Sequence, residues 1–275
     1  MSSIKQLIPA VIRDKLRPWY QSMSRRWWRY ADRWRSAPAS LQELRQHLQQ
    51  SSVLNDTALL YQIAQREYGV LQLDQEIVPA LNYIADSNPS VVGEIGMKHG
   101  GNSFLFTQRF PNVERFIGVD LKLENTYKLQ YLSPARLKIN LVEGSSYAPA
   151  TVEQVRRLLG GRQFDFLFID GDHSWHGARE DFLRYLPLVK PGGLVGFHDI
   201  VPDEVARFGK KQSASQCYGG DVYRLWALLK DRFEHREFVA SWDQIGFGIG
   251  ILRLPAAALS SAERIDLEKH LTLPG

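Results

Sequence analysis

Four side chains able to bind a metal or to move a proton stand at two places in the chain. Asp170 and His173 follow one apolar run, and His198 and Asp199 close another. Two carboxylates and an imidazole are ligands that a hard or borderline divalent cation accepts. Such a cation would lower the pKa of a bound hydroxyl, and His173 could take its proton near neutral pH. The residue types therefore predict a site that activates a hydroxyl group.

These residues can meet only if the two apolar runs are neighbouring strands. Apolar runs and helical periodicity alternate along the chain, which predicts a mainly parallel sheet with ligands at the carboxyl ends of its strands. Neighbouring strands lie about 4.8 Å apart, so Asp170 is expected beside His198 and Asp199. Strands are predicted at residues 90–95, 115–120, 136–142, 163–170 and 194–198, followed by a closing hairpin of residues 237–240 and 246–252. Helices are predicted at residues 41–50, 56–68, 74–85, from 102 onward, 151–159, 178–188 and 221–232.

A glycine-rich turn follows the first predicted strand. It reads Glu94-x-Gly96-x-x-x-Gly100-Gly-x-Ser103, which differs from the G-x-G-x-x-G spacing of a dinucleotide site. Its glycines allow the backbone to approach a ligand, and the N–H groups of the following helix start face that ligand. A carboxylate at Glu94 would repel a pyrophosphate but suits a ligand that carries an ammonium and a sulfonium. The alternative is a turn that serves strand-to-helix packing alone.

Asp120 closes the second predicted strand, about one βα unit after the glycine turn. A carboxylate at this place in a Rossmann sheet can accept hydrogen bonds from both ribose hydroxyls of an adenosine. The alternative is a helix cap or a surface acid. Its position at the carboxyl end of a strand favours the ligand-binding interpretation.

The glycine turn resembles the first motif of the class I S-adenosylmethionine (SAM)-dependent methyltransferases. With the ends of the later strands, it is most similar to the metal-dependent O-methyltransferases of the macrolide-sugar and cephalosporin-hydroxylase-like group. The resemblance covers roughly residues 74–252. It implies an α/β fold with a doubly wound, seven-stranded, mainly parallel sheet (a Rossmann-like methyltransferase fold) and an N-terminal helical extension.

The resemblance also implies roles for individual residues. His173 would be the catalytic base, and Asp170 and Asp199 would bind a divalent metal, magnesium or manganese. His198 stands where the family has an acid. A site that includes His198 as a third ligand would therefore favour manganese, iron or zinc over magnesium. The cofactor-binding residues would be Glu94, Gly96, Gly100, Ser103, Asp120, Ser145, Ser146 and Asp170.

Charge divides the chain into unequal parts. Of a formal net charge of +4, residues 1–35 carry +7, and the rest of the chain carries −3. Residues 1–40 are therefore expected to form a basic, aromatic-rich arm, residues 41–90 a helical cap, residues 91–255 the SAM-binding domain and residues 256–275 a tail. The arm could pack on its own domain or on a second subunit of a homo-oligomer, bind an anionic membrane surface, or, as the least favoured alternative, bind nucleic acid.

Composition places the chain in a broad class. At 275 residues, with 44% hydrophobic and 23% charged residues, it can bury a full core. Its single cysteine, Cys217, excludes an internal disulfide framework and a cysteine-rich zinc site. No apolar run predicts a transmembrane helix, and the first residues lack a signal-peptide pattern. The sequence predicts a cytoplasmic protein, peripheral to the inner face of a membrane if the arm binds lipid.

The expected function is a SAM-dependent O-methyltransferase that acts on a sugar or a glycosylated small molecule, with a divalent metal and a histidine base. Two alternatives stay open at this point. The glycine-turn spacing argues against a nucleotide-cofactor oxidoreductase. The joint presence of Asp170, His173 and Asp199 argues against a noncatalytic SAM-fold binding protein tethered to a membrane-associated glycan assembly system.

Overall fold

The computed structural model describes residues 38–211 and 218–272. The basic arm up to residue 37 and Cys217 lie outside the described residues. The chain divides into two compact units, Met1–His47 and Leu48–Gly275. In the first unit the structure describes one helix, α2 (Pro38–His47). All elements discussed below belong to the second unit.

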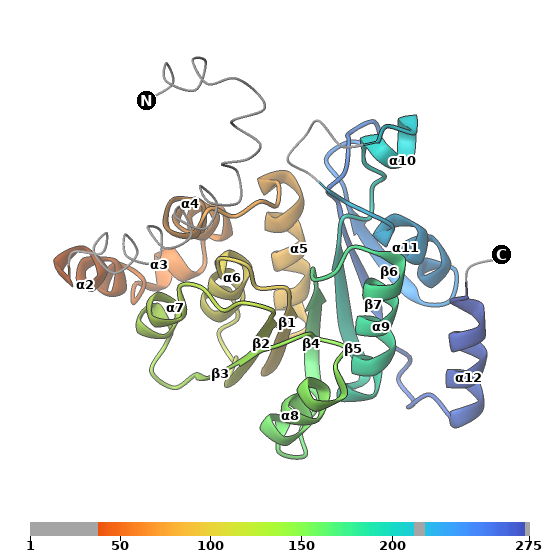
Figure 1. Ribbon diagram of the computed structural model, residues 1–275. Coiled ribbons are helices and arrows are strands. Elements are labelled where there is room, and N and C mark those ends of the chain that lie inside the picture. The colour runs from red at the N-terminus through yellow and green to blue at the C-terminus, as the bar shows by residue number, and fades with distance from the viewer. Residues whose placement is uncertain (1–37, 212–217, 273–275) are drawn as a thin grey trace, which may run out of the picture. The chain divides into compact units, whose positions relative to one another are not determined.

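The second unit is built on one seven-stranded sheet with the order β3-β2-β1-β4-β5-β7-β6 (Figure 1). Strands β1 to β5 run parallel, whereas β7 runs antiparallel to both β5 and β6. This topology confirms the predicted doubly wound, mainly parallel sheet of the Rossmann-like methyltransferase fold. The strands are β1 (Val91–Ile95), β2 (Arg115–Asp120), β3 (Lys138–Glu143), β4 (Phe164–Ile169), β5 (Val189–His198), β6 (Glu234–Phe238) and β7 (Ile249–Arg253).

Helices connect the strands and cover both faces of the sheet. The helices of the second unit are α3 (Ser51–Leu54), α4 (Thr57–Tyr68), α5 (Asp74–Asp86), α6 (Gly101–Arg109), α7 (Thr126–Leu132), α8 (Pro149–Leu159), α9 (Trp175–Tyr185), the 3₁₀ turn η2 (Leu186–Leu188), α10 (Glu204–Phe208), α11 (Val222–Lys230) and α12 (Ser261–His270). Helices α3, α4 and α5 precede the first strand, as the predicted helical extension requires.

Strand β4 shows why the sheet needs a helical layer on each face. Its side chains alternate, and both sets are buried, as expected for a central parallel strand. On one face, Phe166 and Phe168 pack against Phe106 of α6, with ring centroids 5.3 and 5.5 Å apart. On the other face, Leu167 and Ile169 join a buried cluster that contains Phe182 of α9.

Some predicted boundaries differ from the structure. The first hairpin strand was predicted at residues 237–240, but β6 lies earlier, at Glu234–Phe238. The predicted tail contains α12, whose first turn is fixed by a capping box between Ser260 and Glu263. Helices α7 and α10 were not predicted because both are short.

The register of β4 and β5 sets the position of the metal-binding candidates. Ile169 pairs with Phe197, so Asp170 and His198 follow as neighbours at the same edge of the sheet. Both side chains are more than four-fifths buried.

Within residues 38–211 and 218–272, none of the helices combines the length and hydropathy that crossing a bilayer requires.

Candidate active site

A cavity of about 710 Å³ opens at the carboxyl ends of β1, β2, β3, β4 and β5. This volume falls within the range of small-molecule and cofactor sites. The turn after each of these strands lines it, and the segment Gly69–Gln72 between α4 and α5 closes one side. The cavity therefore lies where ligands bind in doubly wound sheets.

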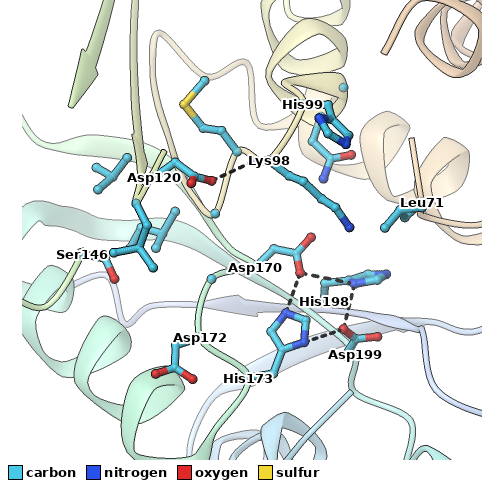
Figure 2. A pocket seen from close by; sticks show the side chains of 18 of the residues that line it. Leu71, Lys98, His99, Asp120, Ser146, Asp170, Asp172, His173, His198 and Asp199 are labelled. Carbon is cyan, nitrogen blue, oxygen red and sulfur yellow. Dashed lines mark hydrogen bonds and ion pairs between the residues drawn. The ribbon is translucent and has the colours of Figure 1, made fainter. Parts of the chain in front are cut away.

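Two carboxylates and two imidazoles form a closed ring on one side of this cavity (Figure 2). Nε2 of His173 lies 3.1 Å from Oδ1 of Asp170, and Nδ1 of His173 lies 3.3 Å from Oδ2 of Asp199. Nδ1 of His198 lies 3.4 Å from the same Asp170 oxygen and 3.2 Å from the same Asp199 oxygen. The structure thus brings together all four residues that the sequence singled out for metal binding and proton transfer.

Each carboxylate of the ring turns one oxygen inward and has the other held by the cavity wall. The side-chain amide of Gln72 donates to Oδ2 of Asp170 at 2.8 Å. The backbone N–H of Phe247 donates to Oδ1 of Asp199 at 3.1 Å. Because the outer oxygens are held in this way, the inner oxygens of both carboxylates face the histidines in a fixed orientation.

The carbonyl oxygen of Tyr218 fixes the orientation and the tautomer of His173. It lies 2.5 Å from Nδ1, so this nitrogen carries the proton and donates it. Nε2, which faces Asp170, is then the nitrogen that can exchange a proton in the cavity.

The charges of the ring shift the pKa values of its members. Burial alone would lower the pKa of His173, but the hydrogen bond to Asp170 and the charges of Asp170 and Asp199 raise it to about 9. Burial opposes the charged form of His198 too, yet the same two carboxylates raise the pKa of His198 well above its ordinary value. Burial would raise the pKa of Asp170, but the two histidines lower it. In the ring as described, positive and negative charges stabilise each other.

The opposite side of the cavity carries the residues predicted to bind adenosine. Asp120 at the end of β2 accepts from the backbone N–H groups of Lys98 and Lys122, at 2.7 and 2.8 Å. Ser145 and Ser146 line the cavity after β3. Asp120 and Ser146 lie on the other side of the cavity from His173 and Asp199 (Figure 2).

Gly96 allows two turns at the floor of the cavity to approach each other closely. Its backbone is left-handed, with φ +85°, and a Cβ atom there would lie 2.0 Å from the carbonyl oxygen of Asp170. The turn after β1 and the turn after β4 can therefore approach this closely only with glycine at this position.

Three of the predicted cofactor residues do not line the cavity. Glu94 is fully buried behind the floor and accepts a hydrogen bond from the Ser103 hydroxyl. Burial raises the pKa of Glu94 to about 8, with the Ser103 hydrogen bond opposing this rise and the charges of Asp170 and Asp120 adding to it. Gly100 begins α6 with a left-handed backbone. The structure places these three residues in and behind the glycine turn, outside the lining of the cavity.

Backbone strain is concentrated at this cavity. Among the described residues, five other than glycine have a positive φ, and three of them line the cavity: Lys98 (φ +49°), Asp199 (φ +62°) and Phe247 (φ +62°). The remaining two are asparagines, which tolerate this conformation. Strained backbone that gathers at one place is typical of a functional site.

The sequence pattern did not point to several cavity residues, among them Gln72, Lys98 and Asn102. Gln72 lies 98 positions before Asp170, and no local pattern predicts that the two meet. Lys98 stands in the glycine turn, where only the backbone conformation directs its side chain inward. Asn102 was read as a helix residue, but it lines the cavity and is 7% exposed, and its Oδ1 has no partner among the described residues.

The residues present fit both a divalent cation and SAM. Nδ1 of His198 lies within 3.4 Å of the inner oxygen of each carboxylate, and Asp170, His173 and Asp199 offer ligand atoms within 4.8 Å of one another. This donor set suits manganese, iron or zinc at least as well as magnesium. For SAM, the buried and unpartnered Oδ1 of Asn102 provides an acceptor for an ammonium group.

Solved structures with the same fold include several methyltransferases. MycE methyltransferase from the mycinamycin biosynthetic pathway, in complex with Mg, SAH and mycinamycin VI, is 21% identical with a TM-score of 0.50. The match covers 73% of this chain and 55% of that chain, so the present chain spans little more than half of MycE.

Two further matches cover more of the other protein. The O-methyltransferase TomG from Streptomyces achromogenes, in complex with SAM, is 17% identical with a TM-score of 0.50, covering 73% of this chain and 90% of TomG. An O-methyltransferase from Bacillus cereus in complex with SAH is 14% identical with a TM-score of 0.50, covering 74% and 91%. At these identities the similarity shows the fold.

Membership of a family rests on the sequence match. No curated protein matches the chain. The family model described as "Rhamnosyl O-methyltransferase/CmcI" matches residues 58–216, a segment that contains the glycine turn, Asp120 and the complete carboxylate–histidine ring. Because this segment is more than half of the 275 residues, the chain belongs to the rhamnosyl O-methyltransferase/CmcI family.

Proposed function

We propose that this protein transfers a methyl group from SAM to a hydroxyl of a sugar or of a glycosylated small molecule. The observation that carries the proposal is the carboxylate–histidine ring of Asp170, His173, His198 and Asp199 in the same cavity as Asp120 and Ser146. Family membership agrees with this reaction. MycE, a protein of the same fold, was solved with Mg, SAH and mycinamycin VI.

The two sides of the cavity divide the work. Asp120 would accept the ribose hydroxyls, and Ser145 and Ser146 would contact the adenine. Gly96 gives the methionine part of SAM close access to the backbone. Glu94 and Ser103 would act indirectly, because their buried hydrogen bond holds the glycine turn in shape. SAM bound in this way would point its sulfonium towards the carboxylate–histidine ring.

The ring would prepare the acceptor hydroxyl. Asp170 and Asp199 would hold a divalent metal, with His198 as the third ligand, because their donor atoms already face one another. A bound cation would polarise the acceptor hydroxyl and, by sharing the charge of both carboxylates, lower the pKa of His173 towards neutrality. Nε2 of His173 would then take the hydroxyl proton, while Tyr218 keeps the opposite nitrogen protonated.

Variants of His173 test this proposal. His173→Ala should lower methyl transfer by roughly 10²–10⁴-fold because the proton loses its acceptor, while SAM binding stays nearly unchanged. His176→Ala is a matched control, since His176 stands three residues later, against Tyr147, and does not line the cavity. The protein is incubated with isotope-labelled SAM and cell extract, which supplies the acceptor. Mass spectrometry then measures the labelled methylated product.

A chelator titration tests the metal. Activity should disappear in excess chelator and return with magnesium or manganese. Full activity in excess chelator would contradict the metal role, and full turnover by His173→Ala would contradict the histidine base. Failure of labelled SAM to donate a methyl group to any extract component would contradict the reaction itself.

A further inference from the structure

Lys98 is a cavity residue to which the proposed reaction gives no task. It lies in the turn between β1 and α6, with a left-handed backbone of φ +49°. A lysine in this conformation costs about 1 kcal/mol or more relative to glycine, which adopts it freely. Its N–H donates to Asp120 at 2.7 Å, and this bond fixes the backbone so that the side chain enters the cavity (Figure 2).

The Lys98 ammonium lacks a counter-charge within the part of the chain that the structure describes. No carboxylate among residues 38–211 and 218–272 lies within ion-pair distance of its Nζ atom. The acids of the cavity are already engaged. Asp120 is held by backbone N–H groups, Asp172 by Ser174, and both carboxylates of the ring by histidines.

The Lys98 side chain extends to the side of the cavity that holds the carboxylate–histidine ring, where the methyl acceptor would bind. In Figure 2 it runs away from Asp120 and Ser146 and ends on the side where His198 and Leu71 lie. SAM and a divalent metal would both bring positive charge to this region, and Lys98 adds more. Lys98 is exposed to solvent in the open cavity, but once SAM and a metal are bound beside it, like charges at short range repel one another unless an anion accompanies them.

We infer that Lys98 binds a carboxylate of the methyl acceptor, so that the acceptor is an acidic sugar of the uronic acid type rather than a neutral one. This inference rests on the proposed function and narrows its substrate class. The carboxylate would pair with the ammonium while a neighbouring hydroxyl faces the carboxylate–histidine ring. Leu71 and Tyr218, which are 46% and 62% exposed at the cavity, offer apolar surface to the sugar ring.

A carboxylate could also come from the methionine end of SAM, and the choice of ligands separates the two sources. S-adenosylhomocysteine carries that carboxylate, whereas methylthioadenosine lacks the amino acid part. Calorimetry compares both in the wild-type protein and in Lys98→Met. On our inference the variant binds both as tightly as the wild-type protein does. A selective loss of S-adenosylhomocysteine affinity would assign Lys98 to the cofactor and overturn the inference.

The acceptor side is tested with a pair of probes that differ in one carboxylate, nitrophenyl glucuronide and nitrophenyl glucoside. With S-adenosylhomocysteine and magnesium present, the wild-type protein should bind the glucuronide on the order of tenfold more tightly, as expected for one charge-assisted contact. Lys98→Met should lose this preference, and Lys98→Arg should keep it. Lys122→Met is the matched control, because Lys122 lies on the same rim but is already paired with Glu124.

The remaining outcomes decide against the inference. Equal binding of the two probes by the wild-type protein, no detectable binding of the glucuronide, or a preference that persists in Lys98→Met would overturn it. If the wild-type protein does not bind S-adenosylhomocysteine, the proposed function fails instead, so the two failures are distinguishable.

Discussion

At the scale of single residues, the site depends on side chains that are held from behind. Gln72 and the backbone of Phe247 bind the outer oxygens of Asp170 and Asp199. Donors of this kind orient the carboxylates and restrict their rotation. The carboxylates are therefore already in position when a metal or substrate binds. We therefore predict that Gln72 positions Asp170, although no sequence motif pointed to it.

The buried carboxyl of Glu94 makes stability depend on pH. Its pKa is raised from an ordinary 4.5 to about 8 because the folded protein buries it. Between these two values, the unfolded chain is ionised at Glu94 and the folded protein is protonated, so the folded state binds more protons. The free energy of unfolding must then decrease as pH rises through this interval.

Glu94→Gln should remove this dependence. The amide imitates the protonated carboxyl, so the variant should match the wild-type protein near pH 4.5 and exceed it by a few kcal/mol near pH 8. Urea unfolding at the two pH values measures the difference. Parallel pH profiles for the two proteins would show that Glu94 does not titrate in this range.

The residues with polar chemistry were predictable from sequence, and the residues that support them were not. Asp170, His173, His198 and Asp199 follow apolar runs, and the rule that parallel strands share one edge places them together. Lys98 gave no such signal, because its role depends on a left-handed backbone that sequence does not display. The sequence predicts that Glu94 binds the cofactor, and in the structure its side chain is fully buried and does not line the cavity.

At the scale of elements, the close crossing of two turns defines the site. Gly96→Ala would place a methyl group 2.0 Å from the Asp170 carbonyl oxygen. One of the two turns must move, and we expect a loss of more than about 3 kcal/mol of stability together with loss of SAM binding.

Gly100→Ala is the matched control. This glycine has the same φ of +85°, but its nearest atoms lie 3.8 Å away, on the Tyr68 ring. The substitution should therefore cost only the left-handed backbone penalty, about 1–2 kcal/mol. Thermal unfolding and calorimetry compare the two variants, and equal losses would mean that the approach of the turns is not what constrains Gly96.

Strands were easier to predict than short helices. The bounds of β2 match the prediction at both ends, since an apolar run ends at an acid. Helix α7 is a seven-residue element that buries only Leu129 and Leu132, so its periodicity is too short to recognise. Strand β6 is partly exposed along its length. Its polar sequence (EHREF) resembles that of a turn, so the apolar pattern of a strand is missing.

At the scale of the whole molecule, the basic arm remains a separate question. The described elements that form the cavity all lie in the unit Leu48–Gly275. We predict that deletion of residues 1–35 leaves SAM affinity unchanged and abolishes sedimentation with anionic vesicles, because the deleted segment carries the +7 charge. Binding of the full chain should weaken with salt. Equal sedimentation with neutral vesicles, or loss of folding on deletion, would favour packing of the arm on protein.

The central claim is that this cavity binds SAM and not a dinucleotide. Thermal unfolding of the full chain with S-adenosylhomocysteine, with NAD or with buffer alone tests it most directly, each with and without manganese. At a ligand concentration of about 100 times the dissociation constant, binding contributes roughly 2.7 kcal/mol, which raises Tm by about 5–10 °C for a domain of this size. We predict this rise with S-adenosylhomocysteine and none with NAD. An equal or larger rise with NAD, or no rise with S-adenosylhomocysteine, would contradict the assignment.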